Sequence, residues 1–95
     1  MNNRRILIID DEIDIANNIK AILKDENYDA SIAYNSTEAF NYITKNNYNL
    51  IILDVWLDNS ELDGIGILQK LRETSSTPVI LSLIHISEPT RRAII

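Results

Sequence analysis

The sequence predicts a single α/β domain in which helices flank a parallel sheet. Short, unbroken apolar runs, which are typical of strands buried on both faces, alternate with segments of helical periodicity. Alternation of this kind favours right-handed crossovers between parallel strands. Of the 95 residues, 45% are hydrophobic and only two are glycine and two proline, so the chain can pack one small core.

The first half of the chain contains two predicted strand–helix pairs. Residues 5–9 are an unbroken apolar run, and residues 12–25 have helical spacing with Asn27 as the expected C-terminal stop. The expected buried face of this helix carries Ile15, Ala16, Ile19, Ile22 and Leu23. Residues 28–34 alternate weakly and predict the second strand. Residues 35–38 have the spacing of a capping box, so a second helix is expected to follow.

The second half continues the alternation. The expected elements are a strand over 49–53, a polar loop over 56–63, a helix over 64–73, a turn over 74–78 and a strand from Val79. The helix carries Ile65, Leu68 and Leu71. Two of the buried-strand runs end in acidic residues, the first in Asp10 and Asp11 and the third strand in Asp54.

Composition narrows the classes of function. The net charge of -5 disfavours direct binding to nucleic acid and suits a metal cation or a basic partner. The absence of cysteine excludes disulfides and thiolate metal sites, and it fits a cytoplasmic location. The longest apolar runs are far too short to span a membrane, and the N-terminus has no signal-peptide pattern.

The acidic residues at the two strand ends predict a functional pocket. In an open α/β sheet, ligands bind at the carboxyl ends of the strands, so Asp10, Asp11 and Asp54 converge if their strands are neighbours. Carboxylates this close repel one another, and a hard cation such as Mg²⁺ relieves that repulsion. A carboxylate held at the opening can attack phosphorus and form an acyl phosphate, with Mg²⁺ neutralising the charge.

A simpler interpretation applies to each acidic feature alone. Paired acids after a strand often do no more than stabilise the N-terminus of the next helix, and Asp10 and Asp11 by themselves favour that interpretation. Asp54 by itself favours neither. The combination of acids at two matched strand ends favours the pocket.

These residues resemble the receiver domains of bacterial response regulators, the phosphate-accepting domains of two-component systems. The resemblance covers about residues 4–80 and rests on Ile-Leu-Ile-Ile-Asp-Asp-Glu at 6–12, Asn-Ser-Thr-Glu-Ala at 35–39, Leu-Ile-Ile-Leu-Asp at 50–54 and Asp63-Gly64. It implies a flavodoxin-like (CheY-like) fold with strand order 2-1-3-4-5.

The resemblance also implies roles for the acidic residues. Asp54 would accept a phosphoryl group from a sensor histidine kinase, so the domain would be a phosphoacceptor and not an enzyme that turns over a substrate. Asp11 would bind Mg²⁺ directly, and Asp10 would hold it largely through water. The main-chain carbonyl of Trp56 would be a further ligand.

The loop after Asp54 departs from the common receiver pattern. No proline follows the acceptor, and nine positions separate Asp54 from Asp63 where most receivers have seven. The stretch over residues 54–64 resembles the NtrX-like subgroup of nitrogen-regulation regulators. That likeness implies a full-length parent with an AAA+ ATPase and a DNA-binding domain.

The last residues do not fit the family pattern. The position of the hydroxyl that senses the phosphoryl group is Leu83, and no lysine follows Lys70 to supply the one that ends the family's fifth strand. Residues 81–91 resemble one translated frame of a transposase-type sequencing adapter. We therefore expect residues 1–80 to be the N-terminal portion of a receiver, residues 81–95 to be a non-native tail, and signalling to be impaired. The alternative is a divergent fourth strand and tail.

Two other functions remain open at this point. A phosphatase of the haloacid-dehalogenase type also uses a strand-end aspartate, but it needs a second aspartate where this chain has Trp56. A receiver-like module that only binds a partner, without phosphorylation, would need none of the acids. His85 stands without neighbouring ligands, so we assign it no metal or phosphotransfer role.

Overall fold

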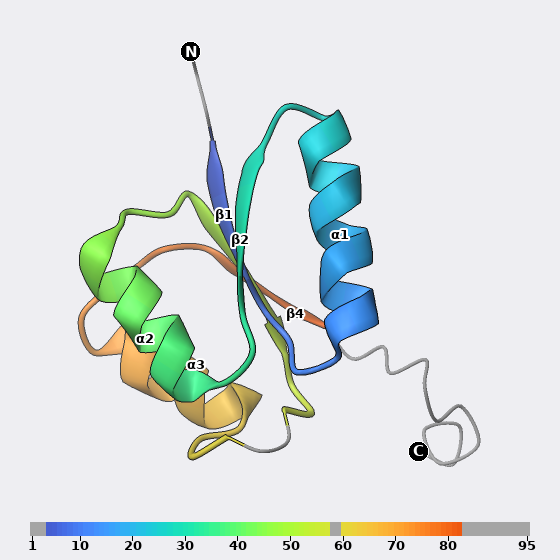
Figure 1. Cartoon of the computed structure of the whole chain (residues 1–95). Helices are drawn as coiled ribbons and strands as arrows, with labels where there is room; N and C mark the ends of the chain where they lie inside the picture. Colours follow the sequence, from blue (N-terminus) through green and yellow to red (C-terminus); the bar gives the residue numbers. More distant parts are fainter. Residues whose placement is uncertain (1–3, 58–59, 83–95) are drawn as a thin grey trace.

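The computed structural model describes residues 4–57 and 60–82. Strands and helices alternate along the chain, as the sequence predicts (Figure 1). The strands are β1 (Arg5–Ile9), β2 (Asp29–Ala33), β3 (Leu50–Asp54) and β4 (Val79–Ser82). The helices are α1 (Ile13–Asp25), α2 (Ser36–Lys45) and α3 (Gly64–Arg72).

The strands form one parallel sheet in the order β2-β1-β3-β4. This confirms the flavodoxin-like order for the strands that the structure describes. Helix α1 covers one face of the sheet, and α2 and α3 cover the other (Figure 1). Because β1 lies between β2 and β3, the chain changes its direction of winding there, and the carboxyl ends of β1 and β3 lie side by side.

Two apolar clusters hold the helices against the sheet. On one face, residues of β1 and β3 pack with residues of α2 and α3, among them Leu7, Leu53, Ala39, Ile67 and Leu71. On the other face, Ile8, Ala16 and Ala30 form a smaller cluster, with Ile19 and Leu23 packed against it. The central strand β1 is buried on both sides, which explains its unbroken apolar sequence.

The ends of the first two helices follow the expected sequence signals with one difference. Asn27 has a positive φ of 69° and ends α1, and its N–H donates to the carbonyl of Lys24 at 2.9 Å. At α2, the side chain of Asn35 accepts from the N–H of Glu38 at 2.9 Å, as in a capping box. The carboxylate of Glu38 reaches back one residue further than expected, to the N–H of Tyr34 at 2.8 Å.

Two apolar side chains that helical periodicity groups with the core lie at the surface. Ile22 of α1 is 63% exposed, so its assignment to the buried face is wrong, and Ile65 of α3 is 41% exposed. The periodicity of a helix gives the direction of its apolar face, but the width of the covered stripe depends on the neighbouring elements. Strand β4 runs to Ser82, so Leu81 and Ser82 of the expected tail belong to this strand, and residues 83–95 lie outside the described part.

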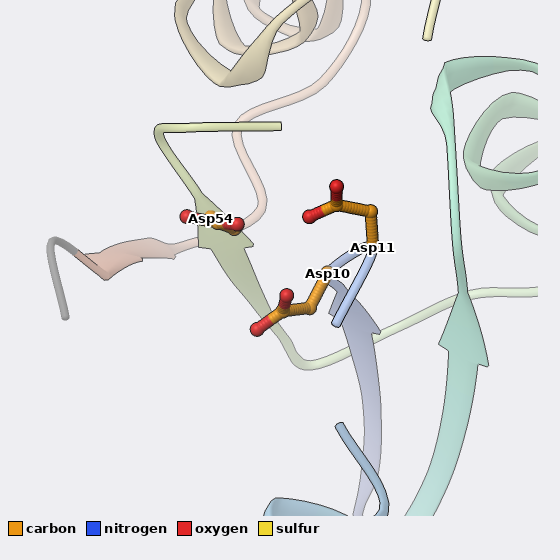
Figure 2. Close-up of side chains that lie close together, drawn as sticks. All are labelled: Asp10, Asp11 and Asp54. Atoms are coloured by element: carbon orange, nitrogen blue, oxygen red, sulfur yellow. The ribbon is translucent and has the colours of Figure 1, made fainter. Parts of the chain in front are cut away.

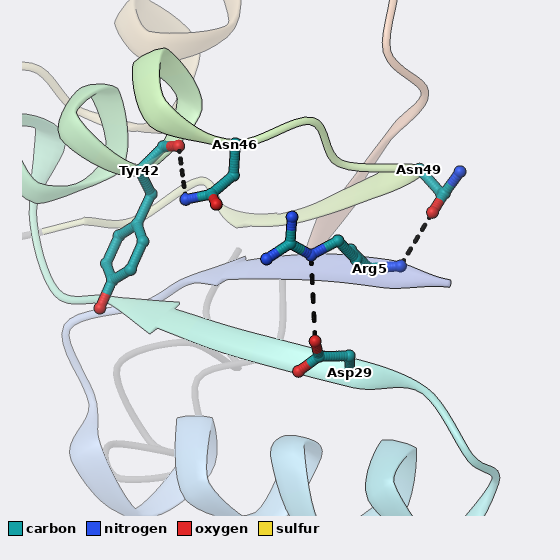
Figure 3. A network of polar contacts seen from close by, with 5 residues as sticks. All are labelled: Arg5, Asp29, Tyr42, Asn46 and Asn49. Carbon is teal, nitrogen blue, oxygen red and sulfur yellow. Dashed lines mark hydrogen bonds and ion pairs between the residues drawn. The ribbon is translucent and has the colours of Figure 1, made fainter. Parts of the chain in front are cut away.

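Polar contacts join the strands at the amino end of the sheet (Figure 3). The N–H of Arg5 donates to the side-chain oxygen of Asn49 at 2.8 Å, and the guanidinium of Arg5 lies 3.9 Å from the carboxylate of Asp29. The ion pair is largely exposed and therefore adds little to stability. Asp10, Asp11 and Asp54 lie at the opposite end of the sheet, where β1 and β3 end.

Candidate phosphoacceptor and metal site

Three carboxylates converge where β1 and β3 end (Figure 2). Asp10 and Asp11 follow β1, and Asp54 is the last residue of β3. One carboxylate oxygen from each residue lies within 4.8 Å of the other two. Asp10 and Asp54 are buried at 5% and 2% exposure, and Asp11 is more accessible. The convergence that the sequence predicts is therefore present.

Main-chain amides fix the two buried carboxylates. The N–H of Glu12 donates to Oδ1 of Asp10 at 2.9 Å, and the N–H of Trp56 donates to Oδ1 of Asp54 at 3.0 Å. In both cases the aspartate accepts from the residue two positions later, which turns the chain sharply as it leaves the strand. Both side chains are therefore held at the carboxyl ends of β1 and β3 without any ligand.

The simpler interpretation of Asp10 and Asp11 as helix caps does not describe this structure. The N-cap of α1 is Glu12, and no side-chain hydrogen bond caps the helix there. Asp10 instead accepts from Glu12 in the turn ahead of the helix. Asp10 is thus held in the turn ahead of α1, and one carboxylate oxygen from each of the paired acids lies close to Asp54.

Gly64 allows α3 to begin directly against the end of β3. A Cβ at this position would overlap the carbonyl oxygen of Asp54 and approach the Cα of Val55 to 2.7 Å. Neither of these main-chain atoms can move without shifting the end of β3. The sequence shows Gly64 as the start of a helix, but its close approach to Asp54 is visible only in the fold.

The donor set fits a hard divalent cation. Carboxylate oxygens are the ligands that Mg²⁺ prefers, and one from each of the three residues lies close enough to the others to share an ion. Trp56 follows Asp54 by two positions, and its side chain is 39% exposed. The metal-binding role of its main-chain carbonyl stays a prediction, as does the assignment of Asp54 as the phosphoacceptor.

Sequence reasoning missed one feature of the loop that follows Asp54. Ser36 at the start of α2 makes two hydrogen bonds to the loop: its N–H donates to the hydroxyl of Ser60, and its own hydroxyl accepts from the N–H of Leu62. No local spacing could have indicated the pair, because it depends on how α2 and the loop pack together. Leu83 and His85, which the sequence analysis singled out, lie outside the described residues.

None of the helices in residues 4–57 and 60–82 has the length and apolar character that a bilayer crossing requires.

Response regulators are among the known proteins that this chain is similar to in sequence and in structure. An NtrX-like response regulator of Rickettsia bellii is 47% identical over 68 residues, which are 72% of this chain and 14% of that protein. The receiver domain of NtrX from Brucella abortus has a TM-score of 0.80 at 31% identity, over 94% of this chain and 73% of that chain. The response regulator TrrA of Thermotoga maritima, solved with Mg²⁺ and BeF, has a TM-score of 0.78 at 28% identity, over 92% of this chain and 75% of that chain.

The extent of these matches differs between domain and whole protein. The chain spans about a seventh of the length of the Rickettsia bellii relative, so it corresponds to one domain of that protein. The sequence model of the response regulator receiver domain family, in contrast, matches residues 6–95, which is nearly the whole chain. The chain therefore belongs to the response-regulator receiver domains, which act in two-component signalling and are phosphorylated on an aspartate.

Proposed function

We propose that Asp54 accepts the phosphoryl group, with Mg²⁺ held by Asp10, Asp11, Asp54 and the main-chain carbonyl of Trp56. The observation that carries the proposal is the convergence of three carboxylates within 4.8 Å at the carboxyl ends of β1 and β3. Such a group of like charges is costly for a fold to keep unless a cation binds there.

The position of Asp54 supports its choice as the acceptor. It ends β3, which has neighbouring strands on both sides, so its main chain is held from two directions. Its Oδ1 atom accepts a hydrogen bond from the N–H of Trp56, which orients the carboxylate at the carboxyl end of β3. Asp10 and Asp11 follow β1 in a turn and face Asp54 from one side (Figure 2), as ligands of a shared ion would.

The proposed reaction transfers phosphorus from nitrogen to oxygen. A carboxylate oxygen of Asp54 forms a bond to phosphorus while the bond from phosphorus to a histidine nitrogen of the kinase breaks. The imidazole leaves with the electron pair and later takes a proton from water. When bound, Mg²⁺ would neutralise the negative charge of the phosphoryl oxygens during the transfer. The residues of the chain contribute the nucleophile and its fixed orientation.

Incubation with phosphoramidate or acetyl phosphate and Mg²⁺ tests the proposal. We expect intact-protein mass spectrometry to show the addition of one phosphoryl group to the wild type. No group should be added when EDTA removes the Mg²⁺, or in Asp54→Asn. Asp25→Asn is the matched control, because this carboxylate is exposed at the end of α1, far along the chain from the acids. Labelling that persists in Asp54→Asn would reject Asp54 as the acceptor.

The same assay separates the other two functions. A phosphatase would hydrolyse a small phosphoester through many turnovers, whereas a phosphoacceptor is modified once per chain. An interaction module without phosphorylation would remain unlabelled in the wild type. The intact group of acids favours labelling over both alternatives.

We further propose that the donor in the cell is a sensor histidine kinase and that the domain works in the cytoplasm. The support is membership of the receiver family together with the likeness to NtrX-type regulators. Because the chain matches only 14% of the length of one such relative, an AAA+ domain and a DNA-binding domain would belong to a longer parent protein. The net charge of -5 makes the receiver itself a poor ligand for nucleic acid.

A further inference from the structure

The loop that follows the acceptor is fixed at both ends by hydrogen bonds. At its start, the N–H of Trp56 donates to the carboxylate of Asp54 at 3.0 Å. At its end, the side chain of Asp63 accepts from the N–H of Gly66 at 2.8 Å and caps α3. Of the residues described between these points, Ser60 and Leu62 make further contacts with the rest of the fold.

Ser36 provides two contacts of this kind, one to Ser60 and one to Leu62. The N–H of Ser36 donates to the hydroxyl oxygen of Ser60 at 2.8 Å. In the opposite direction, the N–H of Leu62 donates to the hydroxyl oxygen of Ser36 at 3.4 Å. We call this pair of contacts the serine clamp. It joins the first residue of α2 to the loop that leaves Asp54.

The location of Ser36 makes the clamp difficult to replace with water. Ser36 is the first residue of α2, where main-chain N–H groups have no partner inside the helix. It is only 3% exposed, so its N–H depends on a protein acceptor. The hydroxyl of Ser60 is that acceptor.

The loop is attached to the same region of the fold through its apolar side chain as well. Leu57, the residue after Trp56, is 6% exposed and belongs to the core cluster that contains Ala39 of α2. Leu57 therefore anchors the start of the loop in the core, and the clamp anchors Ser60 and Leu62 to α2. A shift at Leu57 would move the neighbouring main-chain carbonyl of Trp56.

We propose that Ser36 and Ser60 are positioning residues for the metal site. They hold the long loop against α2 and so keep the carbonyl of Trp56 where a cation beside Asp54 would use it. This inference rests on the proposed function, since it assumes that Mg²⁺ binds at the acids. It assigns a task to the two serines that their spacing in the sequence does not suggest.

Magnesium titration of the full 95-residue chain tests the inference, with fluorescence of Trp56, its single tryptophan, as the signal. We expect Ser60→Ala to raise the half-saturating Mg²⁺ concentration by roughly tenfold, the scale for losing a residue that orients a metal ligand. Ser60→Thr keeps the hydroxyl and should restore most of the affinity. Ser75→Ala is the matched control, because Ser75 also accepts from a main-chain N–H, that of Thr77 at 3.1 Å, but in the turn before β4.

Two further measurements separate positioning from a general loss of stability. Hydrogen exchange at the amides of Ser36 and Leu62 should accelerate in Ser60→Ala, while exchange in β1 stays unchanged. Labelling by phosphoramidate should slow in Ser60→Ala at low Mg²⁺ and recover at saturating Mg²⁺. A variant that is only partly unfolded would not recover in this way.

The possible results distinguish the clamp from the proposed function. If the wild type binds Mg²⁺ and Ser60→Ala binds it with the same affinity, the clamp has no positioning role and the proposed function stands. If Ser75→Ala weakens binding as much as Ser60→Ala does, the effect is one of stability and the inference is rejected. If the wild type binds no Mg²⁺, the proposed function fails and the inference fails with it.

Discussion

Asp54 and Ser82 lie opposite each other in the parallel register of β3 and β4. The main chain secures the pair, because the N–H of Val55 donates to the carbonyl of Ser82 at 3.2 Å. The family pattern assigns the hydroxyl that senses the phosphoryl group to position 83, one residue later, which is leucine in this chain. Partners in a parallel register point to the same face of the sheet, so the hydroxyl of Ser82 lies on the face of Asp54 although it stands one residue before that position.

We therefore expect Ser82→Ala to slow labelling by phosphoramidate by about tenfold, because the hydroxyl shares the face of Asp54. The substitution keeps the carbonyl that binds Val55, so the pairing of β3 with β4 should be unchanged. The rate is measured by mass spectrometry over time at fixed Mg²⁺. A rate within about twofold of the wild type would show that the hydroxyl of Ser82 takes no part in the reaction.

Magnesium should stabilise the folded chain through the acidic group. The proposed site exists only where the fold brings the three carboxylates together, so an ion bound there would favour the folded state by about 2.7 kcal/mol at a hundredfold excess over its dissociation constant. Thermal melts with Mg²⁺ and with EDTA measure the effect as a difference in Tm.

Asp11→Asn should have two opposite effects in the same melts. Without metal, the melting temperature should rise, because one of three neighbouring charges has been removed. With metal, most of the stabilisation by Mg²⁺ should disappear, because Asp11 is one of the proposed ligands of the ion. An unchanged response to Mg²⁺ in this variant would exclude Asp11 as a ligand.

The two glycines of α3, Gly64 and Gly66, allow a controlled test of how closely this helix must approach Asp54. Gly64→Ala should destabilise the fold by about 1–3 kcal/mol and slow labelling, because the added methyl meets main-chain atoms of Asp54 and Val55. At Gly66 an added methyl would meet the side chains of Asp63 and Leu62 at 3.3 Å, and these can shift. Gly66→Ala should therefore be close to neutral, since alanine also favours the helix.

Urea unfolding of both variants measures these changes directly. Equal losses of stability in the two variants would mean that the contact at Asp54 does not decide the effect. Labelling of Gly64→Ala at the wild-type rate, in a folded sample, would show that the end of β3 tolerates the shift.

Strand β4 forms an edge of the described sheet and exposes apolar side chains. Ile80 is 53% exposed and Leu81 is 40% exposed, and an apolar edge strand is a template for pairing with another chain. We expect the protein to associate as its concentration rises and Ile80→Lys to reduce this association. Sedimentation velocity over a range of concentrations provides the measurement, with Ile22→Lys on exposed α1 as the control. A chain that stays monomeric throughout would contradict the expectation.

The parts of the fold that sequence predicts well are those set by local physics. The unbroken apolar run of β1 and the run that ends in Asp54 gave strands within a residue of their observed bounds. The convergence of the acids followed from topology, because parallel strands expose their carboxyl ends at one edge of the sheet. Asn27 ends α1 in the left-handed region, where asparagine is tolerated.

The parts that sequence could not predict depend on contacts between distant elements. Ile22 fits the apolar face of α1 by spacing, yet it is exposed because the sheet below the helix covers a narrower stripe. The contact of Gly64 with Asp54 and the bond between Ser36 and Ser60 arise only when α2, α3 and β3 are packed. Periodicity carries no information about such pairs.

The pairing of β1 with β3 has a consequence for the order of events during folding. Ile9 and Leu53 are partners in the register although β2 and two helices separate them along the chain, so the sheet closes at this point by a contact of long range. Contacts of that kind form late and slowly compared with helices. The acids meet only when this closure is complete. In a refolding experiment, sensitivity of Trp56 to Mg²⁺ should thus appear after helical circular dichroism and report the moment at which the two halves of the sheet join.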